Sequence, residues 1–144
     1  MMVAACLTLG ACGKSETDVI SSAKAHLDKR DVKTATVELK ALLQKTPQSG
    51  EGRYLLGRAL LESGDLAGAE AELNRALENK YSDEIVAPVM AQVLYSQRQY
   101  RKLTDRYAKF EVADAQAATT LKVILGLAFA AQGQKDEAHV AIKR

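Results

Sequence analysis

The sequence is poor in the residues that build nucleic-acid surfaces. It has no tryptophan, two phenylalanines and five tyrosines among 144 residues, which leaves little material on which bases could stack. Its formal net charge is +2, too close to neutral to capture nucleic acid electrostatically. We therefore expect no nucleic-acid partner.

The residues that build catalytic and metal sites are equally scarce. His26 and His139 are the two histidines, Cys6 and Cys12 are the two cysteines, and neither histidine has a cluster of carboxylates around it in the sequence. His26 falls on the apolar stripe of its predicted helix, where we expect a half-buried, satisfied ring. No Ser/His/Asp arrangement, phosphate-binding glycine loop or His-Glu-x-x-His sequence occurs. We predict no metal, no cofactor and no enzymatic activity, with a catalytic domain beyond Arg144 as the alternative.

What the sequence does contain is a repeated pattern of small and apolar residues. Its units start at Glu16, Gly50, Glu84 and Thr119, which lie 34, 34 and 35 residues apart. In the second unit an apolar run breaks at Gly64, and apolar residues then recur at helical spacing. Gly57 lies inside the first helix of this unit, where glycine costs about 1 kcal/mol relative to alanine. We therefore expect a neighbouring helix to leave no room for a side chain at Gly57.

The units resemble the tetratricopeptide repeat family. The second unit carries the most complete set of matching residues: Leu56, Gly57, Leu60, Gly64, Asp65, Ala69, Leu73 and Ala76. It departs from the family at Arg53, which replaces an aromatic residue, and at Tyr81, which replaces the closing proline. The third unit is the weakest, with Arg98-Gln99 in place of Gly-Asp and Leu103 in place of the central alanine. The resemblance implies an all-α fold, a right-handed α-solenoid of antiparallel helix pairs over residues 16–144, with the last unit incomplete.

The pattern predicts a helix pair in each unit. The expected helices cover residues 17–30, 32–45, 52–62, 66–79, a helix from about residue 83 that contains Pro88, then 100–111, 117–132 and 136–144, with an irregular joint at 112–116. Arrays of this kind need a polar capping helix for solubility, and none follows the last pair. We therefore expect the chain to be part of a longer array.

The first twelve residues follow a different pattern from the repeats. Met1 to Cys12 is an apolar run too short to span a membrane, and it fits the tail of a secretory signal. Leu9-Gly10-Ala11-Cys12 resembles the bacterial lipobox, which implies cleavage after Ala11 and a lipid on the Cys12 thiol. Residues 1–11 are then a signal peptide, truncated or preceded by further residues because no basic residue comes before the apolar run, and residues 12–15 are an anchor and linker. The alternative is a short buried helix of the first repeat.

The same resemblance implies a location and a system. A lipobox protein is anchored to the membrane of a bacterial cell envelope and faces the periplasm, and Gly13 after the cysteine favours the outer membrane. Residues 32–77 and 84–103 look like the start of the PrsT group of long tetratricopeptide lipoproteins, which accompany PEP-CTERM/exosortase and exopolysaccharide systems. The implied role is a non-catalytic scaffold for export or sorting. Alternatives are an outer-membrane assembly or pilus-biogenesis lipoprotein, and a polysaccharide-binding module.

Protein partners of this family lie in a concave groove lined by the first helix of each pair. Carried over position by position, the predicted groove residues are Lys24, Asp28, Tyr54, Arg58, Leu61, Glu62, Gln92, Tyr95, Val123 and Leu127, within a wider set that includes Ile20, Leu27 and Pro88. The groove is mixed in character near the N-terminus and apolar toward the C-terminus, and a helix or extended segment of a partner fits such a surface. For Val123 and Leu127 the alternative is packing against further repeats.

A run of basic residues stands apart from these positions. It consists of Arg98, Arg101, Lys102, Arg106 and Lys109. One interpretation is a contact with anionic lipid headgroups or acidic polysaccharide. The other is the solvated outer face of a helix, partly neutralised by Asp105 and Glu111.

The lipobox leads to the first testable prediction. We expect Cys12→Ala to abolish palmitate labelling and to release the chain from membranes, because the thiol that would carry the lipid is removed. Metabolic labelling and cell fractionation measure both effects, with Cys6→Ala as the control because Cys6 would leave with the signal. Retention of the Cys12 variant in the membrane would argue against the lipobox.

Overall fold

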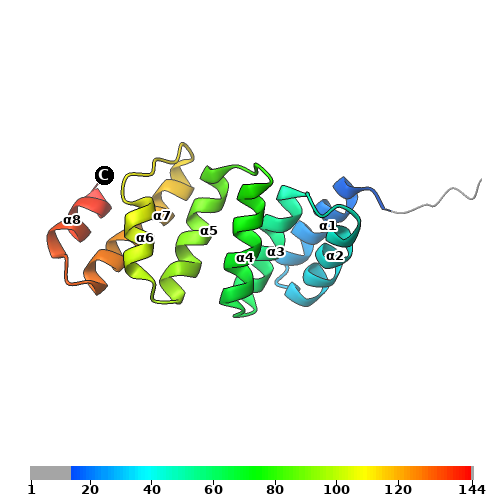
Figure 1. Ribbon diagram of the computed structural model, residues 1–144, viewed down its shortest axis with the longest axis horizontal. Coiled ribbons are helices and arrows are strands. Elements are labelled where there is room, and N and C mark those ends of the chain that lie inside the picture. Colours follow the sequence, from blue (N-terminus) through cyan, green and yellow to red (C-terminus); the bar gives the residue numbers. More distant parts are fainter. Residues whose placement is uncertain (1–13, 144) are drawn as a thin grey trace, which may run out of the picture.

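The computed structural model describes residues 14–143, and in this range it contains eight α-helices and no strand. They are α1 (Glu16–Asp28), α2 (Val32–Lys45), α3 (Gly50–Glu62), α4 (Leu66–Glu78), α5 (Asp83–Ser96), α6 (Tyr100–Tyr107), α7 (Ala115–Ala131) and α8 (Lys135–Lys143). The helices form successive antiparallel pairs along one axis (Figure 1), which confirms the α-solenoid of helix pairs. We call these pairs units 1 to 4.

The signal peptide predicted for residues 1–11, the lipid attachment at Cys12 and the last residue, Arg144, lie outside the described residues. Within residues 14–143 no helix combines the length and apolar character needed to cross a membrane.

The two helices of a unit cross where one of them carries a small residue. A Cβ atom on Gly57 of α3 would lie 2.8 Å from Leu73 Cγ and 3.4 Å from the Ala69 carbonyl oxygen of α4. The same contact recurs in unit 4, where a Cβ atom on Gly126 would lie 2.6 Å from Ile142 Cγ1. The expectation that a neighbouring helix excludes a side chain at Gly57 is confirmed.

The turn inside each unit repeats one backbone conformation. The middle one of its three residues has a positive φ in every unit: 59° at Arg30, 84° at Gly64, 59° at Arg98 and 78° at Gly133. The residue after it donates its N–H to the first helix, from Asp65 to the Leu60 carbonyl at 2.9 Å and from Gln99 to the Leu94 carbonyl at 2.9 Å. Arg98-Gln99 therefore makes the same turn as the expected Gly-Asp, with a non-glycine residue in the left-handed region.

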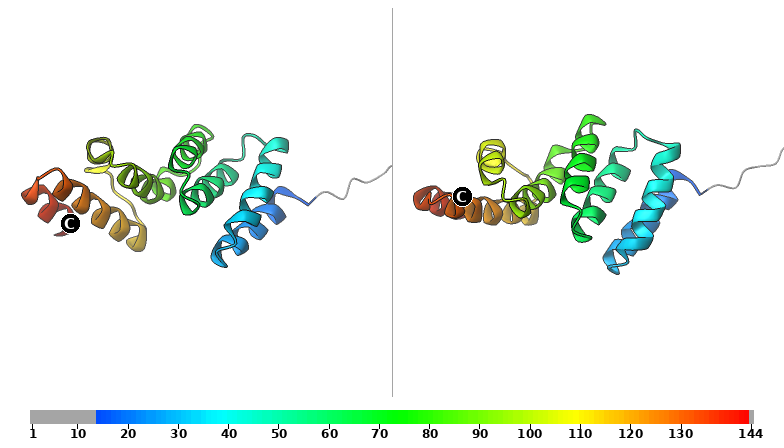
Figure 2. Two further views of the ribbon diagram at one scale, coloured as in Figure 1. Left: turned by 90° about the horizontal axis from the view of Figure 1, so that it is seen from below. Right: turned by 60° about the horizontal axis from the view of Figure 1, so that its bottom comes forward.

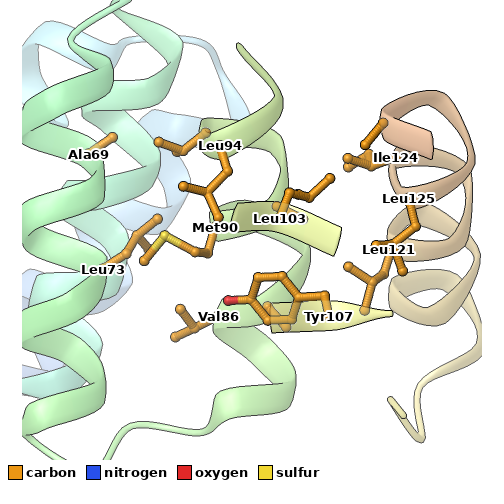
Figure 3. Packing of buried hydrophobic residues seen from close by; sticks show 14 of the residues in the cluster. Ala69, Leu73, Val86, Met90, Leu94, Leu103, Tyr107, Leu121, Ile124 and Leu125 are labelled. Carbon is orange, nitrogen blue, oxygen red and sulfur yellow. The ribbon is translucent and has the colours of Figure 1, made fainter. Parts of the chain in front are cut away.

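Unit 3 departs from the others in its packing. At the positions of Ala69 and Leu73 it has the larger Leu103 and Tyr107, both buried (Figure 3), and α5 packs less extensively on α6 than α3 does on α4. The Phe110 ring meets the Tyr107 ring edge-on, with centroids 5.7 Å apart. The chain turns away there, so α6 ends at Tyr107 and the prediction of a helix through Glu111 is wrong.

The following joint is shifted for the same reason. Residues 108–114 are outside any helix, earlier than the expected joint at 112–116, and α7 begins at Ala115. Asp114 caps α7, because its Oδ1 accepts a hydrogen bond from the Ala117 N–H at 2.8 Å.

The core forms two apolar clusters. One joins α1, α2 and α3 around residues such as Leu39 and Leu55, and the other joins α4 to α7 around Leu73 and Met90 (Figure 3). Tyr54 and Leu60 of α3 pack against both clusters. Each unit thus shares its core with the units beside it, as in repeat proteins generally.

Arg53 has a structural role. Its Nη1 donates to Glu72 Oε2 of α4 at 2.7 Å, and its Nε donates to the Pro47 carbonyl at 3.1 Å. Arg75 Nη1 donates to the other oxygen of the buried Glu72 carboxylate. Arg53 therefore ties the loop between α2 and α3 to unit 2.

The crossing at Gly57 allows a stability prediction. We expect Gly57→Leu to lower the free energy of unfolding by about 1–3 kcal/mol, because the new side chain overlaps Leu73 and forces the helices apart. Urea unfolding followed by circular dichroism measures the effect. Ala67→Leu, on the exposed side of α4, is the matched control, with an expected change within about 0.5 kcal/mol. An unchanged midpoint for Gly57→Leu would contradict the repeat register.

Candidate binding face

The ten predicted groove residues lie on the first helix of each unit and are exposed or half-buried. We call this set the binding face; its members are Lys24 and Asp28 of α1, Tyr54, Arg58, Leu61 and Glu62 of α3, Gln92 and Tyr95 of α5, and Val123 and Leu127 of α7. Figure 2 shows the four units following one another from α1 to α8 along the long axis. The face therefore extends along the array rather than converging on one point.

Three residues of the wider predicted set do not belong to this face. Ile20 and Leu27 are 7% and 3% exposed and pack in the first core cluster, and Pro88 is buried within α5. Their predicted place in the groove is wrong, because the apolar stripe of each first helix faces the neighbouring helices.

The N-terminal end of the binding face is charged and aromatic. Lys24 Nζ of α1 lies 2.6 Å from Glu51 Oε1 of α3, which joins the first two units across the face. The Tyr54 ring packs against the Tyr81 ring with centroids 5.2 Å apart. This end offers an ion pair, a guanidinium group from Arg58 and two phenol rings.

The two phenols remain protonated at neutral pH. Burial raises the pKa of Tyr54, and the nearby Arg58 charge opposes that shift. Burial, with a further contribution from the Glu51 carboxylate, raises the pKa of Tyr81 to about 12. Both rings are therefore neutral, and their hydroxyl groups can donate hydrogen bonds to a bound segment.

The middle of the face is formed by α5. Gln92 is exposed, while Tyr95 is half-buried and packs against Tyr100 with ring centroids 5.4 Å apart. Tyr95 thus supports the turn between α5 and α6 and presents only part of its ring to the face.

The C-terminal end of the face is apolar. Val123 and Leu127 are 46% and 47% exposed, and they lie four residues apart on one side of α7. Ala130 and Ala131 are exposed on the same helix. Contiguous exposed apolar surface is found where partners bind, and this end of the face contributes these four side chains to it.

Sequence reasoning missed Tyr81. It lies in the linker between α4 and α5, whereas the family positions are confined to the first helices. The signal was the replacement of the closing proline by an aromatic residue, which can stack on a ring of the preceding unit as Tyr81 does on Tyr54.

His26 has the structural environment expected for it. Its Nδ1 lies 3.0 Å from Asp31 Oδ2, and its side chain is about one-third exposed. Hydrogen bonds from Thr34, followed by the contact with His26, hold the pKa of Asp31 below its usual value. Within residues 14–143 no three histidine, cysteine or acidic side chains gather where a metal ion could bind.

Comparison with known families gives one match. Residues 26–93, from the end of α1 into α5, match the family model described as tetratricopeptide repeat. No curated protein is similar enough to the chain to count as a match.

The environment of Tyr81 predicts a loss of stability at high pH. Its pKa is about 12 in the folded chain and about 10 in an unfolded one. Between these values the unfolded chain releases a proton that the folded chain keeps, so stability that is complete below about pH 10 falls as the pH rises toward 12. Urea unfolding at about pH 9 and about pH 11 measures this loss. Between these pH values the Tyr81→Phe variant should lose less unfolding free energy than the wild type. Equal losses would contradict the raised pKa of Tyr81.

Proposed function

Because residues 26–93 match the tetratricopeptide repeat, a module that generally binds proteins, we propose that the chain is a non-catalytic scaffold that binds a partner segment on the binding face. The observation that carries this proposal is the exposed apolar pair Val123 and Leu127, nearly half uncovered on α7. Apolar side chains on this stripe lose water contact when a partner covers them, which favours binding.

The chemistry of the face defines the segment that fits it. Its partner presents bulky apolar residues toward α7 and polar residues toward the Lys24–Glu51 pair and Arg58. An amphipathic helix or an extended strand with apolar residues at one end meets this requirement. The polar end then fixes the direction of the segment, and the apolar end supplies most of the binding free energy.

The scaffold is anchored to a membrane through Cys12. This part of the proposal is supported by the lipobox sequence Leu9-Gly10-Ala11-Cys12. Each buried methylene contributes about 0.8 kcal/mol, so two or more acyl chains hold a protein stably. The residues between Cys12 and Glu16 span at most about 14 Å, which places α1 close to the membrane surface.

The system served is exopolysaccharide export or PEP-CTERM/exosortase surface-protein sorting, with the scaffold facing the periplasm from the outer membrane. Support comes from the resemblance of residues 32–77 and 84–103 to the PrsT lipoproteins and from Gly13 after the cysteine. An outer-membrane assembly or pilus-biogenesis scaffold and a polysaccharide-binding module are the competing functions.

Photo-crosslinking in cells tests this function. A benzophenone amino acid at Gln92, exposed in the middle of the face, should give a discrete protein adduct. The same probe at Val37, 63% exposed on α2, is the control and should not give it. Adding Leu127→Asp should remove the Gln92 adduct while the circular dichroism spectrum stays unchanged. Identical adducts at both positions, or carbohydrate as the bound species at Gln92, would refute a protein partner on this face.

A further inference from the structure

A second groove lies between α6 and α8, apart from the binding face. One hollow of about 960 Å³ is lined by the loop after α6, by α7 and by α8. A second hollow of about 810 Å³, next to α6 and the turn before α8, shares Ala108, Lys109 and Phe129 with the first. We call the two together the α6–α8 groove.

This groove and the binding face use different sides of α7. The groove is lined on the α7 side by Leu121, Leu125 and Phe129, which are spaced four residues apart. At 3.6 residues per turn their stripe lies roughly opposite the stripe of Val123 and Leu127. A segment bound in the groove therefore does not compete for the exposed apolar pair.

The groove exists because of the unusual packing of unit 3. Since α6 ends at Tyr107 and Phe110 folds back onto the Tyr107 ring, α6 does not extend along α7 beyond that point. Among the described helices, α6 and α8 have no Cα atoms within 8 Å of each other. The opening between them is walled by Phe110, Val112 and Val140.

One end of the groove is apolar and the other is cationic. The larger hollow is lined by the apolar side chains of Phe110, Leu121, Phe129 and Val140. Its rim carries two lysines and three carboxylates: Lys109, Lys122, Glu111, Asp136 and Glu137. Arg101, Arg106 and Lys109 line the smaller hollow, with Asp105 as its one carboxylate. The charges are thus mixed beside the apolar hollow and predominantly positive at the α6 end.

The cations at the α6 end differ in how far they are already paired. Lys102 is bound to Glu70 of α4, and Arg101 lies 3.8 Å from Asp105. Arg106 lies over the Tyr107 ring, 5.2 Å from its centroid. Within residues 14–143 neither Arg106 nor Lys109 forms an ion pair with a carboxylate, and both are exposed. These two cations are available to an anionic ligand group.

We propose that the α6–α8 groove binds an acidic, apolar peptide segment of a partner protein. An aromatic or leucine side chain of the segment occupies the hollow between Phe110 and Val140, and carboxylates next to it pair with Arg106 and Lys109. The segment is acidic because it must complement the charges of Arg106 and Lys109. It is apolar because the hollow is lined by Phe110, Leu121 and Phe129. The docking site is separate from the binding face and does not depend on what that face binds.

Fluorescence anisotropy with the full chain tests the proposal. The probe is a fluorescein-labelled twelve-residue peptide that alternates phenylalanine or leucine with glutamate. Two comparison peptides replace every glutamate by glutamine, or every apolar residue by serine. We expect the probe to bind and both comparison peptides to bind at least about tenfold more weakly.

Variants locate the bound probe. Arg106→Glu with Lys109→Glu should weaken binding about tenfold, because attraction at two sites becomes repulsion. Val140→Asp, at a side chain 54% exposed, should weaken it by a similar factor. The matched controls are Lys33→Glu with Lys40→Glu, and Val37→Asp, all exposed on α2. Circular dichroism of each variant checks that the fold is retained, and the controls should bind like the wild type.

Four results would overturn the proposal. The first is that the probe does not bind, and the second is that the α2 control variants lose as much affinity for it as the groove variants do. The third is that the serine–glutamate peptide binds as strongly as the probe, and the fourth is that Leu127→Asp abolishes binding of the probe. The third would indicate unspecific capture of polyanions, including acidic glycans. The fourth would place the peptide on the binding face instead.

Discussion

The packing of the two helices of a unit, closest in units 2 and 4, is the constraint on which the rest of the structure depends. Where α3 carries Gly57, Leu73 and Ala69 of α4 come into contact with its backbone, and Gly126 repeats this arrangement with Ile142. A pair that crosses so closely turns the apolar stripe of its first helix inward. Its remaining side then faces solvent in every unit, and the binding face follows from this repetition rather than from any local pocket.

Much of this could be predicted because the signals are local. The spacing of small residues predicted the units, and the turns at Arg30 and Arg98 keep the backbone of their glycine counterparts. The early end of α6 could not be predicted, since it depends on how Leu103 and Tyr107 fit between α5 and α7. The burial of Ile20 and Leu27 was missed because family positions indicate a side of the helix, not its distance from the next helix.

The two proposed binding regions lie on opposite sides of α7. The binding face draws its residues from α1, α3, α5 and α7, while the α6–α8 groove depends on the irregular packing of one unit. A partner that carries both kinds of segment would bind the second one intramolecularly once the first is bound. Linked binding of this kind raises overall affinity without any new contact, provided that the linker spans the two regions.

The turn residues give the array an uneven mechanical character. Arg30 and Arg98 hold a positive φ that costs a residue with a side chain about 1 kcal/mol, whereas Gly64 and Gly133 adopt it without that cost. Strained and relaxed turns therefore alternate among the units, and the linker between α4 and α5 holds one more strained residue, Lys80, with a φ of 59°. In a linear array each unit contacts only its neighbours, so this strain is not averaged over the whole molecule. The cost is therefore local: it falls on the turns of units 1 and 3 and on the linker after α4.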